Sequence, residues 1–443
     1  MNNDPSDTAH PSFREAFRFW LKLGFISFGG PTGQIAIMHT ELVERRKWIS
    51  EARFLHALNY CMLLPGPEAM QLATYVGWLL HRTRGGLVAG LLFVLPSAFI
   101  LWALSFVYVT FGKVPAVEAV FYGLKPAVLA IVAVAVIRIG KRVLKNEVMW
   151  SLAGLAFVAI HFLNASFPLI LITAGIIGLA GGKWWPKKFR VVVGHGAKND
   201  KSGGAVLSDE AAAPSHARPS LGRAIRVCAV SLALWWVPVI ALGAWLGWGH
   251  TLFREGLFFS KAAMVTFGGA YAVLPYVGQQ AVEHYGWLDA GQMLDGLGLA
   301  ESTPGPLIMV LQFVGFLGGW QHPGQLPSLA AATLAAFITT WTTFVPCFLW
   351  IFLGAPHIEQ MRGNERLSAA LSAVTAAVVG VVLNLAVWFG MHVLSPNGKT
   401  VDVYAIAVAS VAFVGMMKWK WGVIPVVFGA GLLGMIYKLA LPV

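Results

Sequence analysis

The chain has 443 residues, of which 57% are hydrophobic and only 12% are charged. Soluble domains carry about 25% charged residues, so this composition excludes a soluble enzyme, a disordered protein and a secreted disulfide scaffold, and it indicates a polytopic membrane protein. The net charge of +12 fits the excess of Lys and Arg that marks cytoplasmic loops. Binding to nucleic acid is not expected, because the basic residues form no separate domain.

The chain begins with a polar tail, residues 1–12, which lacks the apolar core of a signal peptide. Residues 13–182 form the first of two predicted repeats. Its apolar segments in chain order are one that contains Phe-Gly-Gly (the FGG motif), one at 54–80 that contains Pro-Gly-Pro (the PGP motif), two crossings at 87–111 and 119–137, and a short helical pair at 148–182. The second crossing ends at four basic residues that are expected in the cytoplasm, Arg138, Lys141, Arg142 and Lys145.

Residues 183–226 are predicted to be a cytoplasmic linker. They hold nine Lys or Arg residues and are rich in Gly, Ser, Ala and Pro, a composition typical of disorder. The second repeat occupies 227–443 and starts with a leading helix at 227–248. Its other predicted crossings, after FGG and PGP segments of its own, are 329–353, 367–391, 403–417 and 422–441.

An internal repeat carries most of the information in this sequence. Phe28-Gly29-Gly30 recurs 239 positions later as Phe267-Gly268-Gly269, and Pro65-Gly66-Pro67 recurs at the same offset as Pro304-Gly305-Pro306. Four further pairs fall on one another at this offset, Lys22 with Lys261, Glu44 with Glu283, Trp48 with Trp287 and Ser50 with Asp289. The last pair consists of residues that favour a helix N-cap, each placed just before an apolar run. So many matches in one ungapped frame indicate a duplication.

The basic residues predict that the two repeats face opposite sides of the membrane. Residues 39–54 contain four Lys or Arg residues, whereas the matching residues 278–293 contain none. Because Lys and Arg mark the cytoplasmic side, the second repeat should be inverted, as in many secondary transporters. The N-terminus is then cytoplasmic.

Basic loops flank both ends of the first FGG segment and both ends of the first PGP segment. A segment with both ends in the cytoplasm cannot cross once, so each is predicted to be a re-entrant helical hairpin that breaks at its glycine motif. Full crossings are the alternative. The predicted fold class is therefore an all-α polytopic membrane protein with two inverted-topology repeats, each with two re-entrant or broken hairpins plus transmembrane helices.

The broken helices predict a site for an anion. A helix that starts at mid-membrane presents free N–H groups and a positive dipole end, and two embedded lysines, Lys22 and Lys261, would match a doubly charged anion. The alternatives are packing kinks at the motifs, snorkelling of the lysines and hydroxyls that bond within their own helices. The other candidate binding residues are Ser27, Gly29, Gly30, Asn59, Pro65, Gly66, Gln71, Thr266, Gly268, Gly269, Thr303 and Gly305.

Glu68 and Glu301 are the candidates for proton coupling. Each PGP segment carries one of these embedded carboxylates, and a carboxylate in a site of low dielectric constant can carry a proton. The alternative is a salt bridge to Lys22, Lys261 or Lys125.

Catalytic motifs are not found. There is no HExxH, no C-x-x-C, no Gly-x-Ser-x-Gly and no P-loop pattern. The three cysteines, Cys61, Cys228 and Cys347, lie far apart in apolar stretches and are expected to be small buried hydrophobes. We therefore expect no catalytic residues, no metal and no cofactor.

The two motifs with their flanks, Phe28-Gly29-Gly30-Pro31, residues 64–73 (LPGPEAMQLA), residues 266–271 (TFGGAY) and residues 303–306 (TPGP), resemble the chromate ion transporter family in its long, two-domain form. The second repeat departs from the first, with Leu307 in place of Glu68. The resemblance implies gradient-driven efflux of chromate across the bacterial inner membrane, with resistance as the outcome and sulfate as a competing analogue.

Several points stay open at this level. The alternatives in function are transport or exchange of sulfate or another oxyanion and, from a different class, a membrane-embedded scaffold or enzyme without transport. Besides chromate, the expected partner is the lipid bilayer. The sequence does not fix the oligomeric state, for which a homodimer is one option.

Overall fold

The computed structural model describes residues 10–28, 30–189, 206–207, 219–267, 269–357, 365–396 and 400–440. Within these ranges the protein is almost entirely helical. The β-type pairing found in them is an isolated bridge between Ile49 and Leu207. Seven helices are long and apolar enough to span a membrane. The prediction of an all-α polytopic membrane protein is confirmed.

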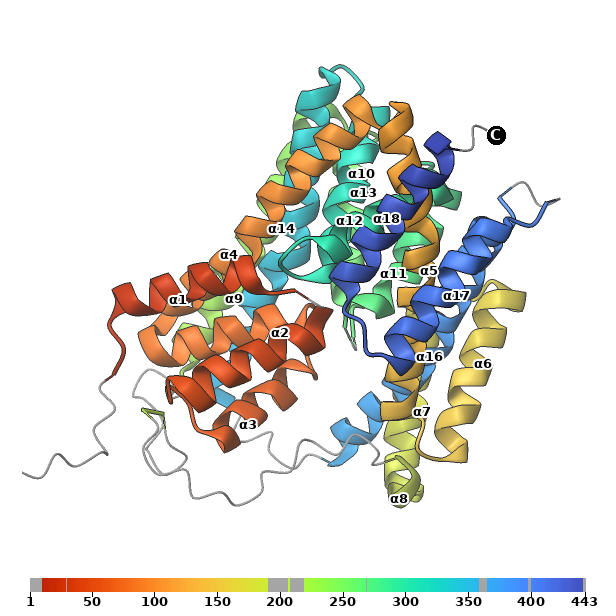
Figure 1. The fold of residues 1–443 in the computed structure, drawn as a ribbon. Coiled ribbons are helices and arrows are strands. Elements are labelled where there is room, and N and C mark those ends of the chain that lie inside the picture. The colour runs from red at the N-terminus through yellow and green to blue at the C-terminus, as the bar shows by residue number, and fades with distance from the viewer. Residues whose placement is uncertain are drawn as a thin grey trace, which may run out of the picture.

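The helices up to the linker follow the predicted order (Figure 1). They are α1 (Phe13–Ile26), α2 (Gly30–His39), a π-helical turn (Thr40–Arg45), α3 (Glu51–Cys61), α4 (Glu68–Phe111), α5 (Pro115–Val143), α6 (Glu147–Leu163), α7 (Phe167–Trp184) and the short α8 (Pro186–Phe189).

The second half starts with an additional helix, α9 (Leu221–Leu246), and then has the same series of elements. They are α10 (Thr251–Met264), α11 (Ala270–Gln279), a π-helical turn (Gln280–His284), α12 (Ala290–Ser302), a 3-10 turn (Leu307–Met309), α13 (Val310–Gln321), α14 (Ser328–Gly354), a 3-10 turn (Ala355–His357), α16 (Glu365–Leu394), α17 (Val403–Lys418) and α18 (Val423–Ala440). A π-helical turn thus follows both α2 and α11.

Local sequence explains where several helices begin and end. The Ser50 side chain accepts a hydrogen bond from the amide of Arg53, and Asp289 forms a full capping box with Gln292, so both predicted N-caps are confirmed. The break expected between 54–80 and 87–111 is a kink rather than a loop. His81 and Arg82 leave helical geometry, with φ +55° at Arg82, and α4 therefore contains two helical rods.

Helices extend into both ends of the range 183–226, and its role as a linker stays a prediction. Helix α7 runs to Trp184 and α9 already begins at Leu221. Leu207 pairs with the strand-like stretch before α3, where its carbonyl accepts from Ser50 N at 3.1 Å. Disorder is predicted for the whole range, and within it residues 190–205 and 208–218 lie outside the described residues.

Helices of the two halves are interleaved in one part of the molecule. Helix α5 packs against α17 and α18, and its counterpart α16 packs against α6 and α7. Figure 1 shows this group at one side, with α1, α2 and α3 at the opposite side. The second half reaches across: α11 packs against α16, and α12 packs against α5 and α18. The close contacts of α3 are instead with α4.

Candidate functional site

The four glycine motifs meet at one place. Gly66 N of the first PGP motif donates to Thr266 O, just before the second FGG motif, at 2.7 Å. Gly305 N of the second PGP motif donates to Ser27 O, just before the first FGG motif, also at 2.7 Å. Each PGP turn therefore pairs with the FGG break of the other half. The two FGG breaks also adjoin, since a Cβ built on Gly269 would lie 4.0 Å from Pro31 Cγ. We call this the FGG–PGP crossing.

Glycine is required at the crossing by backbone conformation. Gly30, Gly66, Gly269 and Gly305 have φ of +69°, +118°, +96° and +105°, a region that L side chains rarely adopt. Space is lacking as well at the two PGP glycines. A Cβ on Gly66 would lie 2.8 Å from Cys347 Sγ, and one on Gly305 would lie 2.4 Å from Ser97 Cβ. Gly29 and Gly268 lie outside the described residues.

Helices start directly at the crossing without side-chain caps. Helix α2 starts at Gly30, α11 follows Gly269, α4 follows Pro67, and the turn that leads into α13 follows Pro306. For the last three, the residue before the helix provides no side-chain hydrogen bond. First-turn N–H groups are therefore left over, and the positive ends of these helices lie at the crossing, where α1, α3, α10 and α12 also end. This arrangement can hold an anion.

The hydroxyls predicted for the site bond within their own helices. Ser27 Oγ donates to Leu23 O and Thr266 Oγ1 to Ala262 O, both at 2.6 Å, and Thr303 Oγ1 donates to Ala300 O at 3.1 Å. The alternative prediction, that these hydroxyls bond within their own helices, therefore describes them, and their protons are not free to bind an anion. The three residues lie at or next to the crossing. They can offer backbone groups to a ligand there, but not their hydroxyl protons.

Two amide side chains stabilise the PGP turns. Gln71 Nε2 donates to Pro65 O at 2.8 Å, within the first turn. Gln34, which sequence reasoning missed, is buried and donates through Nε2 to Gly305 O at 2.6 Å. A buried Gln in an otherwise apolar stretch was the available signal. Asn59 is half-buried on α3.

Lys22 and Lys261 occupy matching positions on α1 and α10, and both side chains are exposed. Neither forms an ion pair with a residue in the described ranges. The structure does not bring these two lysines into contact with the crossing, and their role as anion ligands stays a prediction.

The two predicted carboxylates lie beside the motifs. Glu68 is the first residue of α4, immediately after the first PGP motif, and it is half-buried. Glu301 is buried near the end of α12 and accepts a hydrogen bond from the hydroxyl of Tyr271, two residues after Gly269. The salt bridge offered as the alternative is not formed by either carboxylate within the described residues. Lys125 instead lies 3.7 Å from Asp295 Oδ2.

Sequence reasoning missed two further buried acids. Asp295 on α12 accepts from the Tyr108 hydroxyl at 2.9 Å in addition to its ion pair with Lys125. Glu255 on α10 is fully buried, and neither of its carboxylate oxygens has a hydrogen-bond partner among the described residues. Asp295 is a single charge in an apolar stretch, which is a signal for an embedded acid, whereas Glu255 directly follows Arg254 and gives no such signal.

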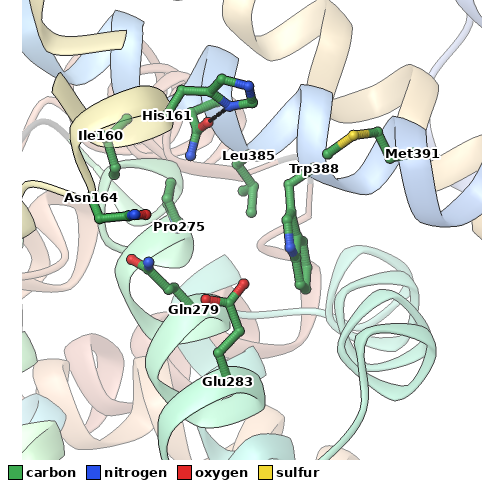
Figure 2. A pocket seen from close by; sticks show the side chains of 10 residues that line it. Ile160, His161, Asn164, Pro275, Gln279, Glu283, Leu385, Trp388 and Met391 are labelled. Atoms are coloured by element: carbon green, nitrogen blue, oxygen red, sulfur yellow. Dashed lines mark hydrogen bonds between the residues drawn. The ribbon is translucent and has the colours of Figure 1, made fainter. Parts of the chain in front are cut away.

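A polar pocket lies at the far end of α11 from the crossing (Figure 2). Its volume is about 190 Å³, and it is bounded by α6, α11, the π-helical turn after α11 and α16. Figure 2 shows the Glu283 carboxylate near Gln279, and across the pocket His161 Nδ1 lies 2.8 Å from Asn384 Oδ1. About 14 residues of helix, or roughly 20 Å, separate Gly269 from Glu283, so the pocket is not part of the crossing.

Comparisons with known proteins agree on one family. The family described as "Chromate transporter" matches residues 14–179 and 253–435. A "Chromate transport protein" of Pseudomonas aeruginosa is 32% identical over 96% of this chain and 92% of its own length. A protein of the same name from Cupriavidus metallidurans is 28% identical over 96% of this chain and 93% of its own. An uncharacterised transporter of Bacillus subtilis is 27% identical over 35% of this chain and 77% of its own length. No solved structure matches.

Proposed function

The chain belongs to the chromate transporter family, and on that premise we propose that it is a secondary active transporter that exports chromate across the bacterial inner membrane and confers chromate resistance. Its N-terminus would be cytoplasmic. Two relatives that match it over nearly their whole length carry chromate transport in their names, and the seven apolar helices make it an integral membrane protein.

The observation that carries the proposal is the convergence of the four motifs at the FGG–PGP crossing. Chromate is a tetrahedral dianion, so its site must supply hydrogen-bond donors from several directions together with positive charge. Uncapped helix starts supply fixed N–H groups and partial positive charges. The hydrogen bonds from Gly66 to Thr266 and from Gly305 to Ser27 fix the positions of these helix starts. Their N–H groups therefore need little reorganisation when an anion binds. Lys22 and Lys261 would add full charges when the anion is present.

Transport requires that the site be exposed to each side in turn, and the packing supports such an exchange. Helices α11 and α12 of the second half pack against α16, α5 and α18, whereas the close contacts of α3 are with α4. If the repeats are inverted, the contacts made by α11 and α12 close the external side, and the first half leaves the cytoplasmic side open. The opposite state would exchange these roles between equivalent elements.

Glu68 and Glu301 remain the candidates for proton coupling. Both carboxylates lie next to a PGP motif, and Glu301 is linked through Tyr271 to the second FGG break. Protonation of either group would change the charge within the site when the anion binds or leaves.

Uptake into inverted membrane vesicles tests this function. Vesicles that contain the chain should accumulate labelled chromate when their lumen, which corresponds to the periplasm, is made acidic and positive relative to the outside, and unlabelled sulfate in excess should reduce the uptake. Vesicles with the Gly66→Ala variant serve as the matched control. Accumulation of sulfate but not chromate would identify the chain as a sulfate transporter, and accumulation of neither anion would leave a scaffold or enzyme without transport.

A further inference from the structure

The C-terminal end of α5 carries two arginines one helical turn apart, Arg138 and Arg142. From the sequence they were assigned to a cytoplasmic basic cluster. In the structure α5 continues to Val143, so both belong to the helix and lie on the same side of it. Both side chains are exposed. Lys145 in the same cluster is used differently, because its Nζ donates to Lys141 O at 2.6 Å and caps the end of the helix.

Arg142 faces the first PGP turn. Its Nη2 lies 3.9 Å from Sδ of Met62, the residue that directly follows α3 and stands three positions before Pro65. The guanidinium therefore lies beside the PGP turn rather than in a loop away from it.

Arg138 lies one helical turn before Arg142 on α5, and α5 packs against α12 of the second half. In the part of the chain that the structure describes, Arg138 forms no ion pair. Arg142 thus lies beside the first PGP motif, and Arg138 lies one turn away on the same side of α5.

The second half has no counterpart to this pair. Helices α5 and α16 correspond at an offset of 250 residues, the same offset that relates Ser97, which contacts Gly305, to Cys347, which contacts Gly66. At this offset Trp388 and His392 stand in place of Arg138 and Arg142. Trp388 lines the pocket of Figure 2 together with the carboxylate of Glu283. Helix α16 therefore has no pair of arginines that corresponds to Arg138 and Arg142 of α5.

We propose that Arg138 and Arg142 form the cationic part of the oxyanion site, opposite the N–H groups of the FGG–PGP crossing. A guanidinium presents parallel N–H donors that match two oxygens of a tetrahedral oxyanion, and two of them balance a dianion. The arginines belong to the interleaved helices and the crossing to the other helices, so a bound anion would bridge the two groups. This inference rests on the proposed function and names residues that the family resemblance did not supply.

Equilibrium binding of chromate and of sulfate to the purified full-length protein tests the pair. The variants are Arg138→Gln, Arg142→Gln and Arg142→Lys, and the control is Arg84→Gln, which removes an exposed charge of the same sign at the start of the second rod of α4. Each Gln variant should weaken the binding of chromate by about 10- to 100-fold, and the Lys variant should weaken it less. The control should bind as the unmodified protein does.

Two results would count against the inference, and they are distinguishable. If the unmodified protein binds chromate or sulfate and both Gln variants bind it equally well, the arginines are not ligands, although the proposed function stands. If the unmodified protein binds neither anion, the proposed function falls and the inference falls with it. Thermal unfolding of each variant without anion separates a loss of ligand contacts from a loss of fold, since a ligand role leaves the unfolding temperature of the empty protein unchanged.

Discussion

The amide of Gly66 donates a hydrogen bond to the carbonyl of Thr266 across 200 residues of chain, at 2.7 Å. The same bond recurs between Gly305 and Ser27, at the same distance and with donor and acceptor taken from the opposite halves. Neither half can complete its own broken helices, because the carbonyl just before each FGG motif accepts its hydrogen bond from the other half's PGP turn. The site therefore exists only when both halves are assembled.

The two PGP glycines should not tolerate a side chain. Gly66→Ala and Gly305→Ala place a Cβ in a positive-φ conformation and against Cys347 or Ser97, which should cost about 1–3 kcal/mol of stability each from backbone strain alone and abolish transport. Gly154→Ala is the control, because a Cβ there meets nothing within 4 Å and a helical Gly→Ala change is neutral or stabilising. Thermal unfolding and vesicle uptake measure the two effects, and normal uptake by both variants would show that the crossing geometry is dispensable.

The ion pair between Lys125 and Asp295 should behave as a unit. The Asp295 side chain is 6% exposed, whereas that of Lys125 is 32% exposed. Lys125→Met therefore leaves a buried carboxylate with only the hydrogen bond from Tyr108, which should cost up to about 3–5 kcal/mol, and Asp295→Asn should cost less because Lys125 is partly solvated. We expect the double variant to recover much of the loss caused by Lys125→Met. A double-mutant cycle on the free energy of unfolding checks this, and purely additive losses would mean that the two groups do not interact.

Substitution of the matched lysines tests whether they bind the anion. Lys22→Gln and Lys261→Gln should each remove one charge-assisted contact, about 1.5–3 kcal/mol, or about 10- to 150-fold in affinity, and should abolish protection of cells against chromate with membrane expression intact. Arg45→Gln is the control, since Arg45 pairs with Glu41 on the surface. Both lysines are exposed in the structure, so normal transport by both variants would identify them as snorkelling residues, and the anion would then be held by other groups.

The features that could be predicted from the sequence are those set by residues close together in the chain. The glycine motifs broke their helices where predicted, and Ser50 and Asp289 capped theirs, because caps and breaks are set within a few residues. The pairing of Gly66 with Thr266 rather than with Ser27 could not be predicted, since both choices satisfy the same backbone groups. The contacts of Arg142 and Asp295 join helices from distant parts of the chain. Charge counts that placed Arg142 in a loop could not show that α5 continues past it.

The inverted orientation of the repeats is open to a labelling test. Arg45 and His284 occupy matching positions in the two π-helical turns and are both exposed. In a background without the three native cysteines, Arg45→Cys should react with a membrane-impermeant thiol reagent only from the cytoplasmic side, and His284→Cys only from outside. Labelling of both positions from one side would contradict the inverted repeat and, with it, the expected cytoplasmic N-terminus.

The packing of α11 on α16 should alternate with an equivalent packing of α2 on α5 during transport. In this structure Glu283 and Trp388 line one pocket, and their counterparts in the first half are Glu44 and Arg138, at offsets of 239 and 250. A short bifunctional thiol reagent should join a Glu283→Cys, Trp388→Cys pair readily, and the bridge should stop transport by holding the external side closed. In the opposite state Glu44 would approach Arg138, a pair of opposite charge that favours that contact, and a Glu44→Cys, Arg138→Cys pair should be joined only when that state is populated. If the bridge between positions 283 and 388 leaves transport unchanged, α11 and α16 do not separate during the cycle, and exposure of the site must alternate by another movement.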